Sequence, residues 1–216
     1  HRGRIVQLPA NDGPHCLHGG PGGSRHQVFT VASHSQDQVE MEWTFESSQD
    51  GFPGEVDLRV RYHLRPDRLT ISYQAQVREA ASPLALTTHP FFNLDGAGQG
   101  SIDDHVLQMD APHYLPVDAS RIPLGHLADV SGTAFDFRRP RRLVDAWTPA
   151  LDPQLNLGVS PGFDHAWATP NSERALRRQA RLSAARSGLV MEVWSDSPSI
   201  QLYTGLAMDA SLPRHA

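Results

Sequence analysis

Residues 56–77 read VDLRVRYHLRPDRLTISYQAQV, and their pattern of polar and apolar side chains predicts the fold class. Hydrophobic side chains occupy every second position of residues 56–64 and again of residues 69–77. A period of two is typical of strands with one buried face and one solvated face. Residues 65–68 (RPDR) are turn formers, so the two strands are expected to form an antiparallel hairpin.

The same alternation appears on both sides of this hairpin. Further strands are expected at residues 39–45, 106–109, 180–184, 189–194 and 200–203. Residues 175–185 have some helical propensity, but their alternation and the following turn at 186–188 favour a strand. Successive antiparallel hairpins with little helix predict an all-β protein built as a large antiparallel β-sandwich.

Composition limits the classes of function. A chain of 216 residues suits one large all-β domain, and 39% hydrophobic with 20% charged residues is typical of a globular protein. The net charge of -5 argues against nucleic acid as a partner. No stretch reaches the roughly 18 apolar residues of a membrane span. The single cysteine, Cys16, cannot form an internal disulfide, and this favours a cytoplasmic location.

The first candidate for chemistry is a histidine beside two glycines. A turn with the sequence NDGP at residues 11–14 leads into LHGG at residues 17–20. Glycines next to His18 would allow the backbone to approach a ligand closely. Taken alone, the segment is more typical of a surface turn whose histidine has no function.

A second histidine, His89, follows a run with strand-like alternation at Leu84 and Leu86 and precedes two aromatic residues. Histidine titrates near neutral pH, so it can donate or accept a proton at little cost. The alternative is a core histidine whose nitrogens are satisfied by the backbone.

Two polar residues near the C-terminus are also candidates. Asp164 lies in a glycine-led segment, and Gln201 lies in the expected strand 200–203 on the face opposite Ile200 and Leu202. The planar amide of Gln201 could hydrogen-bond sugar hydroxyls, or it could simply face solvent. An Asx turn or a cap would explain Asp164 without a function.

Metal and cofactor sites are weighed because the chain has twelve histidines. His15, Cys16 and His18 are possible ligands, but no second pair follows at a suitable spacing. The chain also lacks a nucleotide-binding fingerprint. We therefore expect neither a metal nor a cofactor.

Taken in order, these segments resemble the aldose 1-epimerase family along almost the whole chain. The segments that carry the resemblance are NDGP at 11–14, LHGG at 17–20, DGFPG at 50–54, THPFFNL at 88–94, YLPVD at 114–118, GTAFDFR at 132–138, GFDH at 162–165 and residues 198–205. The resemblance implies a large antiparallel β-sandwich (a supersandwich) with a sugar-binding groove. It also implies a cofactor-free enzyme that interconverts the α and β anomers of free hexoses such as galactose or glucose.

The resemblance assigns a role to each candidate. His89 matches the general acid that protonates the ring oxygen of the sugar, and His18 matches a second active-site histidine that binds the sugar and polarises it. Asp164 and Gln201 match residues that hydrogen-bond sugar hydroxyls. Arg4 matches a substrate-binding arginine.

Two departures from the family pattern concern the ends of the chain. Ile5 is followed directly by Val6, where the family pattern has a further strand and turn of about ten residues, on usual hairpin lengths. The family's catalytic base is a glutamate in a glycine-leucine-x-leucine-glutamate strand, which would begin near Ala216. Residues 1–216 are therefore expected to be a single epimerase-like domain that lacks its N-terminal strands and its C-terminal glutamate strand.

The expected partner is a monosaccharide, an aldohexose, bound by a monomer or a homodimer with no nucleic acid or membrane involved. One alternative is a non-catalytic carbohydrate-binding or regulatory module of the same fold. Another is a glycoside hydrolase or polysaccharide lyase on a similar sandwich, although hydrolases mostly need a carboxylate pair. A relative acting on a hexose 6-phosphate is a further possibility. The residues do not rank one aldose above another.

Overall fold

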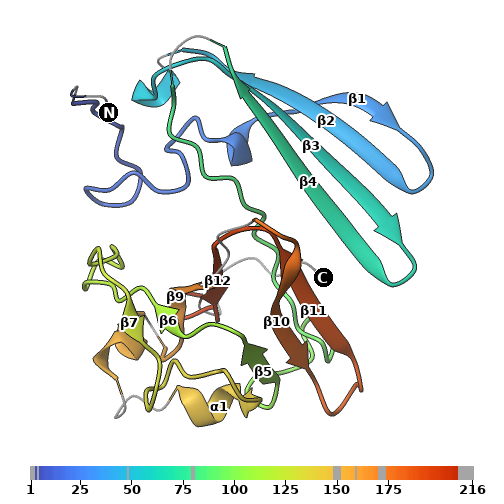
Figure 1. Ribbon diagram of the computed structural model, residues 1–216, viewed down its shortest axis with the longest axis vertical. Helices are drawn as coiled ribbons and strands as arrows, with labels where there is room; N and C mark the ends of the chain where they lie inside the picture. The colour runs from blue at the N-terminus through green and yellow to red at the C-terminus, as the bar shows by residue number, and fades with distance from the viewer. Residues whose placement is uncertain are drawn as a thin grey trace. The chain divides into compact units, whose positions relative to one another are not determined.

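The computed structural model describes residues 3, 5–47, 49–78, 81–147, 152–158, 160–169 and 174–208. Antiparallel strands dominate, with only short helical turns between them (Figure 1). The chain divides into two compact units, His1–His89 and Pro90–Ala216, which are described separately.

The first unit contains one antiparallel sheet of four strands in the order β1-β2-β3-β4. Its elements are η1 (Ser24–His26), β1 (Thr30–His34), β2 (Gln38–Phe45), η2 (Gln49–Gly51), β3 (Val56–Arg65) and β4 (Arg68–Val77). Arg65 pairs with Arg68 across the turn, so the predicted hairpin is confirmed. Its register runs without a shift from this turn to the pair Val56–Val77, because the alternation of both strands matches.

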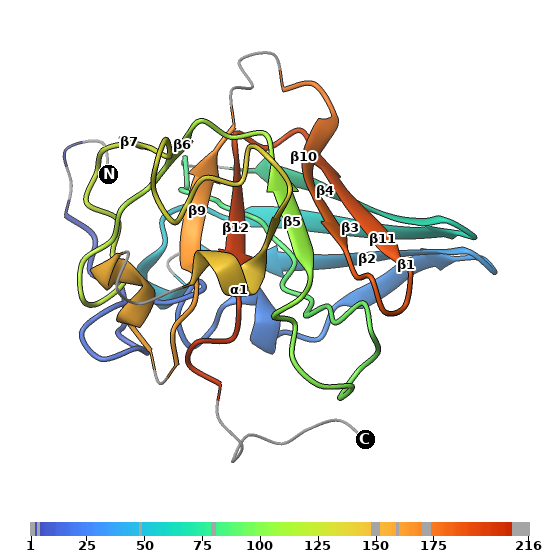
Figure 2. The same ribbon diagram turned by 90° about the horizontal axis from the view of Figure 1, so that it is seen from below.

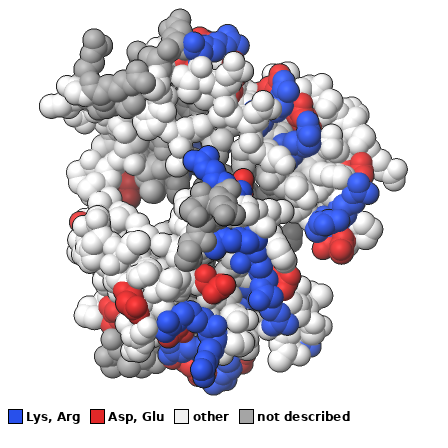
Figure 3. Space-filling view, in the orientation of Figure 1, with Lys and Arg blue, Asp and Glu red and all other residues white. Residues whose placement is uncertain are grey.

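The two faces of this sheet differ in polarity as the alternation predicts. Val56, Leu58 and Val60 of β3 are buried on one face. On the other face, Arg59 forms ion pairs with Glu40 and Glu42 of β2. Acidic and basic side chains are interspersed on the visible surface in Figure 3. In the edge strand β4 the apolar side chains are less buried than those of β3, and several of them remain exposed.

The second unit contains two antiparallel sheets of four strands each, in the orders β11-β10-β5-β8 and β12-β9-β6-β7. Its strands are β5 (Val106–Met109), β6 (His113–Tyr114), β7 (Ala128–Asp129), β8 (Arg141–Arg142), β9 (Asp164–Ala168), β10 (Arg177–Ser183), β11 (Val190–Ser195) and β12 (Ser199–Tyr203). Two short helical segments accompany them, α1 (Leu143–Ala146) and η3 (Pro153–Asn156). Figure 2 shows β9 beside β12 and β10 beside β11.

One hydrophobic core joins the two sheets of the second unit. It takes Leu107 and Met109 from one sheet and Trp167 from the other, and all three are almost completely buried. Phe135 lies in the same core and accepts a hydrogen bond at its carbonyl oxygen from the indole nitrogen of Trp167, at 2.9 Å. Two sheets around one aromatic core form a sandwich-like unit, in agreement with the expected fold class.

Most of the strands expected from alternation are confirmed. The strand at 106–109 has the expected bounds, and residues 177–183 are a strand rather than a helix. The expectation for the run that ends at His89 is wrong, because residues 81–93 have no regular secondary structure. Alternating apolar residues in this segment are therefore not sufficient to predict a strand, because a strand also needs a partner strand to pair with.

Candidate functional site

The loop that carries His18 is held by the side chain of Asn11. The amide oxygen of Asn11 accepts a hydrogen bond from the backbone nitrogen of Leu17 at 2.7 Å, and its amide nitrogen donates to the carbonyl oxygen of Leu17 at 3.0 Å. Both polar groups of one side chain thus fix the residue before His18. The sequence placed Asn11 in a turn but gave it no such role.

The backbone at His18 is left-handed, with φ of 52°, and Gly19 and Gly20 follow with φ of 83° and 80°. Glycine adopts this conformation freely, whereas other residues adopt it rarely. Gly23 returns close to the same loop, and a Cβ added to it would lie 2.4 Å from the carbonyl oxygen of His18. The glycines therefore allow a compact loop that presents an exposed histidine.

His18 and His89 lie next to each other within the first unit. Their ring centroids are 6.0 Å apart, and the ring planes meet at 88°. The two residues are 71 positions apart in the sequence, so the fold brings together two histidines that the sequence predicted separately. Both side chains are exposed. Two adjacent exposed imidazoles can exchange protons with a ligand.

The second unit brings together Asp164 and Gln201. Asp164 begins β9 and pairs in register with Tyr203 of β12, while Gln201 pairs with Ala166. The side chains of Gln201 and Asp164 therefore share one face, and the amide nitrogen of Gln201 donates a hydrogen bond to Oδ1 of Asp164 at 2.9 Å. The predicted strand around Gln201 is confirmed, and Asp164 lies in a strand rather than in an Asx turn.

Two aromatic residues and an arginine accompany this pair, and the sequence reasoning did not single them out as site residues. The rings of Phe91 and Tyr203 make an edge-to-face contact with centroids 5.9 Å apart. The guanidinium Nε of Arg121 lies 3.8 Å from Oδ2 of Asp164. A carboxylate, an amide and an apolar ring pair can recognise both the hydroxyls and the C–H faces of a sugar.

His165 supports this face from the buried side of β9. Its Nδ1 accepts a hydrogen bond from the backbone nitrogen of Asp164 at 3.1 Å, and its Nε2 lies 3.2 Å from the amide oxygen of Gln154. This arrangement fits a neutral imidazole with its proton on Nε2. Burial lowers the pKa of His165 to about 4, so the ring is neutral at physiological pH.

Arg4, the remaining predicted site residue, lies outside the described residues. The described side chains include no group of three histidine, cysteine, aspartate or glutamate residues close enough to hold a metal ion. No helix among the described residues is long and apolar enough to cross a membrane.

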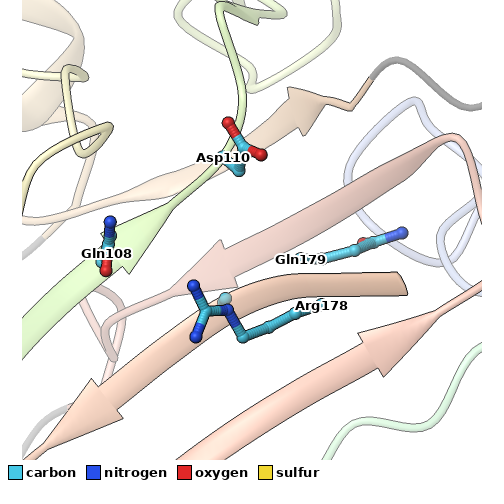
Figure 4. Close-up of a pocket in the computed structure, with 5 residues that line it drawn as sticks. Gln108, Asp110, Arg178 and Gln179 are labelled. Carbon is cyan, nitrogen blue, oxygen red and sulfur yellow. The ribbon is translucent and has the colours of Figure 1, made fainter.

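A separate polar hollow of about 210 Å³ lies on the sheet of β5 and β10, lined in part by Gln108, Asp110 and Arg178 (Figure 4). Two of its lining side chains already have partners: Arg178 forms an ion pair with Glu192 at 2.9 Å, and the amide of Gln108 donates to the carbonyl oxygen of Arg138. The hollow contains none of the predicted site residues.

Comparison with protein families gives one match along the chain. A family model described as aldose 1-epimerase matches residues 1–215. Galactose mutarotase from Bos taurus is 37% identical over 210 residues, which are 97% of this chain and 58% of the relative. Aldose 1-epimerase from Escherichia coli strain K12 is 33% identical over 94% of this chain and 57% of its own length.

Solved structures give the same match. An aldose epimerase homologue from C. elegans superposes with a TM-score of 0.81 at 28% identity, over 94% of this chain and 59% of that one. A galactose 1-epimerase from Lactobacillus acidophilus gives a TM-score of 0.71 at 31% identity, over 85% of this chain and 53% of that one. The chain therefore spans somewhat more than half the length of the relatives that it matches.

Proposed function

Because this chain belongs to the aldose 1-epimerase family, we propose that it forms the larger part of an enzyme that interconverts the α and β anomers of free aldohexoses. The observation that carries the proposal is the contact of His18 with His89, whose ring centroids are 6.0 Å apart. These two histidines stand in separate motifs of the family resemblance, and their proximity supports one site of proton transfer.

The reaction needs two proton transfers and no redox step. A base removes the proton from the C1 hydroxyl. The electron pair left on that oxygen forms the carbonyl bond to C1, and the bond from C1 to the ring oxygen breaks with its electrons going to the ring oxygen. His89, as an imidazolium, donates its proton to the departing ring oxygen. Rotation about the C1–C2 bond followed by the reverse transfers closes the ring as the other anomer. General acid–base catalysis of this kind contributes on the order of 10²–10⁴-fold for each partner.

His18 is proposed to bind the sugar beside His89 and to polarise it. Its left-handed backbone and its flanking glycines keep the imidazole exposed on a tight loop. The base expected from the family resemblance is a glutamate in a glycine-leucine-x-leucine-glutamate motif, which residues 1–216 do not contain. The proposal therefore concerns the complete natural polypeptide.

Asp164 and Gln201 are proposed to orient the sugar through its hydroxyls. Their hydrogen bond fixes the amide, so its oxygen and the free lone pairs of the carboxylate keep defined directions. Tyr203 and Phe91 supply apolar surface beside them. Galactose and glucose are the proposed substrates, and Arg4 is proposed to contact them as well.

Polarimetry of the complete polypeptide with freshly dissolved α-D-galactose or α-D-glucose tests this proposal. The expected result is an approach to anomeric equilibrium that accelerates in proportion to protein concentration. Sugar binding by calorimetry without acceleration would instead identify a carbohydrate-binding module. Cleavage of an oligosaccharide without mutarotation of monosaccharides would identify a hydrolase or lyase, and either result would refute the proposal.

A further inference from the structure

The side chain of Arg121 lies beside Asp164, and we propose that Arg121 is a positioning residue that fixes the Asp164 carboxylate for sugar binding. This inference rests on the proposed function, because it assigns a role within the proposed substrate site. Arg121 lies within a polar turn, and nothing in the sequence distinguishes it from the other arginines.

The backbone of Arg121 provides the first observation. It is left-handed, with φ of 64°, in a turn where Asp118 Oδ1 accepts hydrogen bonds from the backbone nitrogens of Ser120 and Ile122. A residue with a Cβ adopts this conformation at a cost of roughly 1–2 kcal/mol, and glycine avoids that cost. The turn by itself would be more stable with glycine, so the backbone conformation does not explain an arginine at this position.

The contacts of the guanidinium group provide the second observation. One terminal nitrogen donates to the carbonyl oxygen of Leu157 at 3.2 Å, and Nε lies 3.8 Å from Oδ2 of Asp164. Gln201 donates to the other carboxylate oxygen, Oδ1. Each oxygen of Asp164 thus faces a different partner, and rotation of the carboxylate would break one contact or the other.

The contact with Leu157 also anchors the arginine itself. It holds the guanidinium in place from the end of η3, so the group does not depend on Asp164 for its own position. The side chains of Arg121 and Asp164 are 34% and 27% exposed, which leaves the pair accessible to a ligand. A fixed, partly exposed carboxylate suits the recognition of hydroxyl groups, because little entropy is lost when the sugar binds.

A double-mutant cycle in the complete polypeptide tests this role. Arg121→Gly removes the guanidinium and relieves the left-handed backbone, and Asp164→Asn removes the carboxylate charge. Arg121→Gly is expected to raise KM for galactose about fivefold with kcat nearly unchanged, the effect of losing a partly exposed ion pair. In the Asp164→Asn background the same change should have little further effect on KM.

Two further variants separate positioning from stability. Arg174 has the same left-handed backbone, with φ of 50°, and is exposed, so Arg174→Gly is the matched control and should leave KM unchanged. Arg121→Lys keeps the positive charge but loses the planar guanidinium group with its several N–H donors. It should raise KM by less than Arg121→Gly. It also replaces Arg121→Gly in the cycle if that variant does not fold.

The outcomes distinguish this inference from the proposed function. An active wild type together with a KM for Arg121→Gly within twofold of wild type would overturn the inference alone. Fully additive effects of the changes at 121 and 164 would overturn it as well. A wild type that binds sugar but does not interconvert anomers would instead refute the proposed function.

Discussion

Lowering the pH from 7.5 to 5 is expected to destabilise the folded protein through His165. This side chain is 1% exposed, and its folded-state pKa is about 4 against about 6.5 when unfolded. Between these two pKa values His165 is therefore protonated in the unfolded state and neutral in the folded state. The contribution to stability is fully present above pH 6.5 and is lost as the pH falls toward 4.

The linkage relation gives the size of this loss. For one group with these two pKa values, the free energy of unfolding falls by about 2 kcal/mol at pH 5 and by about 3 kcal/mol at pH 4. Hydrogen bonds from neighbouring side chains lower the pKa values of the carboxyl groups of Asp37, Asp57, Asp129, Asp136 and Glu192, so these groups act in a more acidic range. The loss of stability expected between pH 7.5 and 5 is therefore assigned to His165.

Urea denaturation at pH 7.5 and pH 5 measures the effect in wild type and in His165→Gln, which cannot be protonated in this range. The variant should be less stable at pH 7.5 but should lose about 2 kcal/mol less between the two pH values than wild type. His126 is exposed, so His126→Gln is the control and should retain the wild-type loss. An equal loss in wild type and His165→Gln would show that protonation of His165 does not cause the loss of stability.

Two further predictions concern the site residues. Gly23→Ala would place a Cβ 2.4 Å from the carbonyl oxygen of His18, so the loop must shift. The kcat for mutarotation, measured by polarimetry, should then fall at least tenfold. An unchanged kcat would contradict the described loop. Gln201→Glu would replace the amide that donates to Asp164 at 2.9 Å with a second carboxylate. Because the two carboxylates repel each other, kcat/KM should fall about tenfold at pH 7.5 and partly recover at lower pH. A pH-independent loss would show that charge repulsion is not the cause.

The long strands could be predicted from the sequence because each one carries its own alternating pattern. β3 and β4 have ten residues each, enough to define both faces and a turn. The strands β6, β7 and β8 have only two residues each, too few to show a period. Their pairing depends on residues distant in the sequence, so local patterns could not indicate them.

Candidate site residues were predicted from the sequence only where they lie in a recognisable motif. His18, His89, Asp164 and Gln201 stand in such motifs, and the fold brings each pair together through long-range contacts. Arg121 could not be found in this way. Its side chain meets Asp164 across 43 residues of sequence, and only the folded backbone brings the two together.

The most direct test of the account is the rate of anomer interconversion by His89→Asn in the complete polypeptide. Asparagine preserves polarity and approximate size but cannot donate a proton as an imidazolium does. Catalysed mutarotation of α-D-galactose is expected to fall by about 10²–10⁴-fold while the protein remains folded. A rate close to that of the wild type would mean that His89 does not deliver the proton to the ring oxygen.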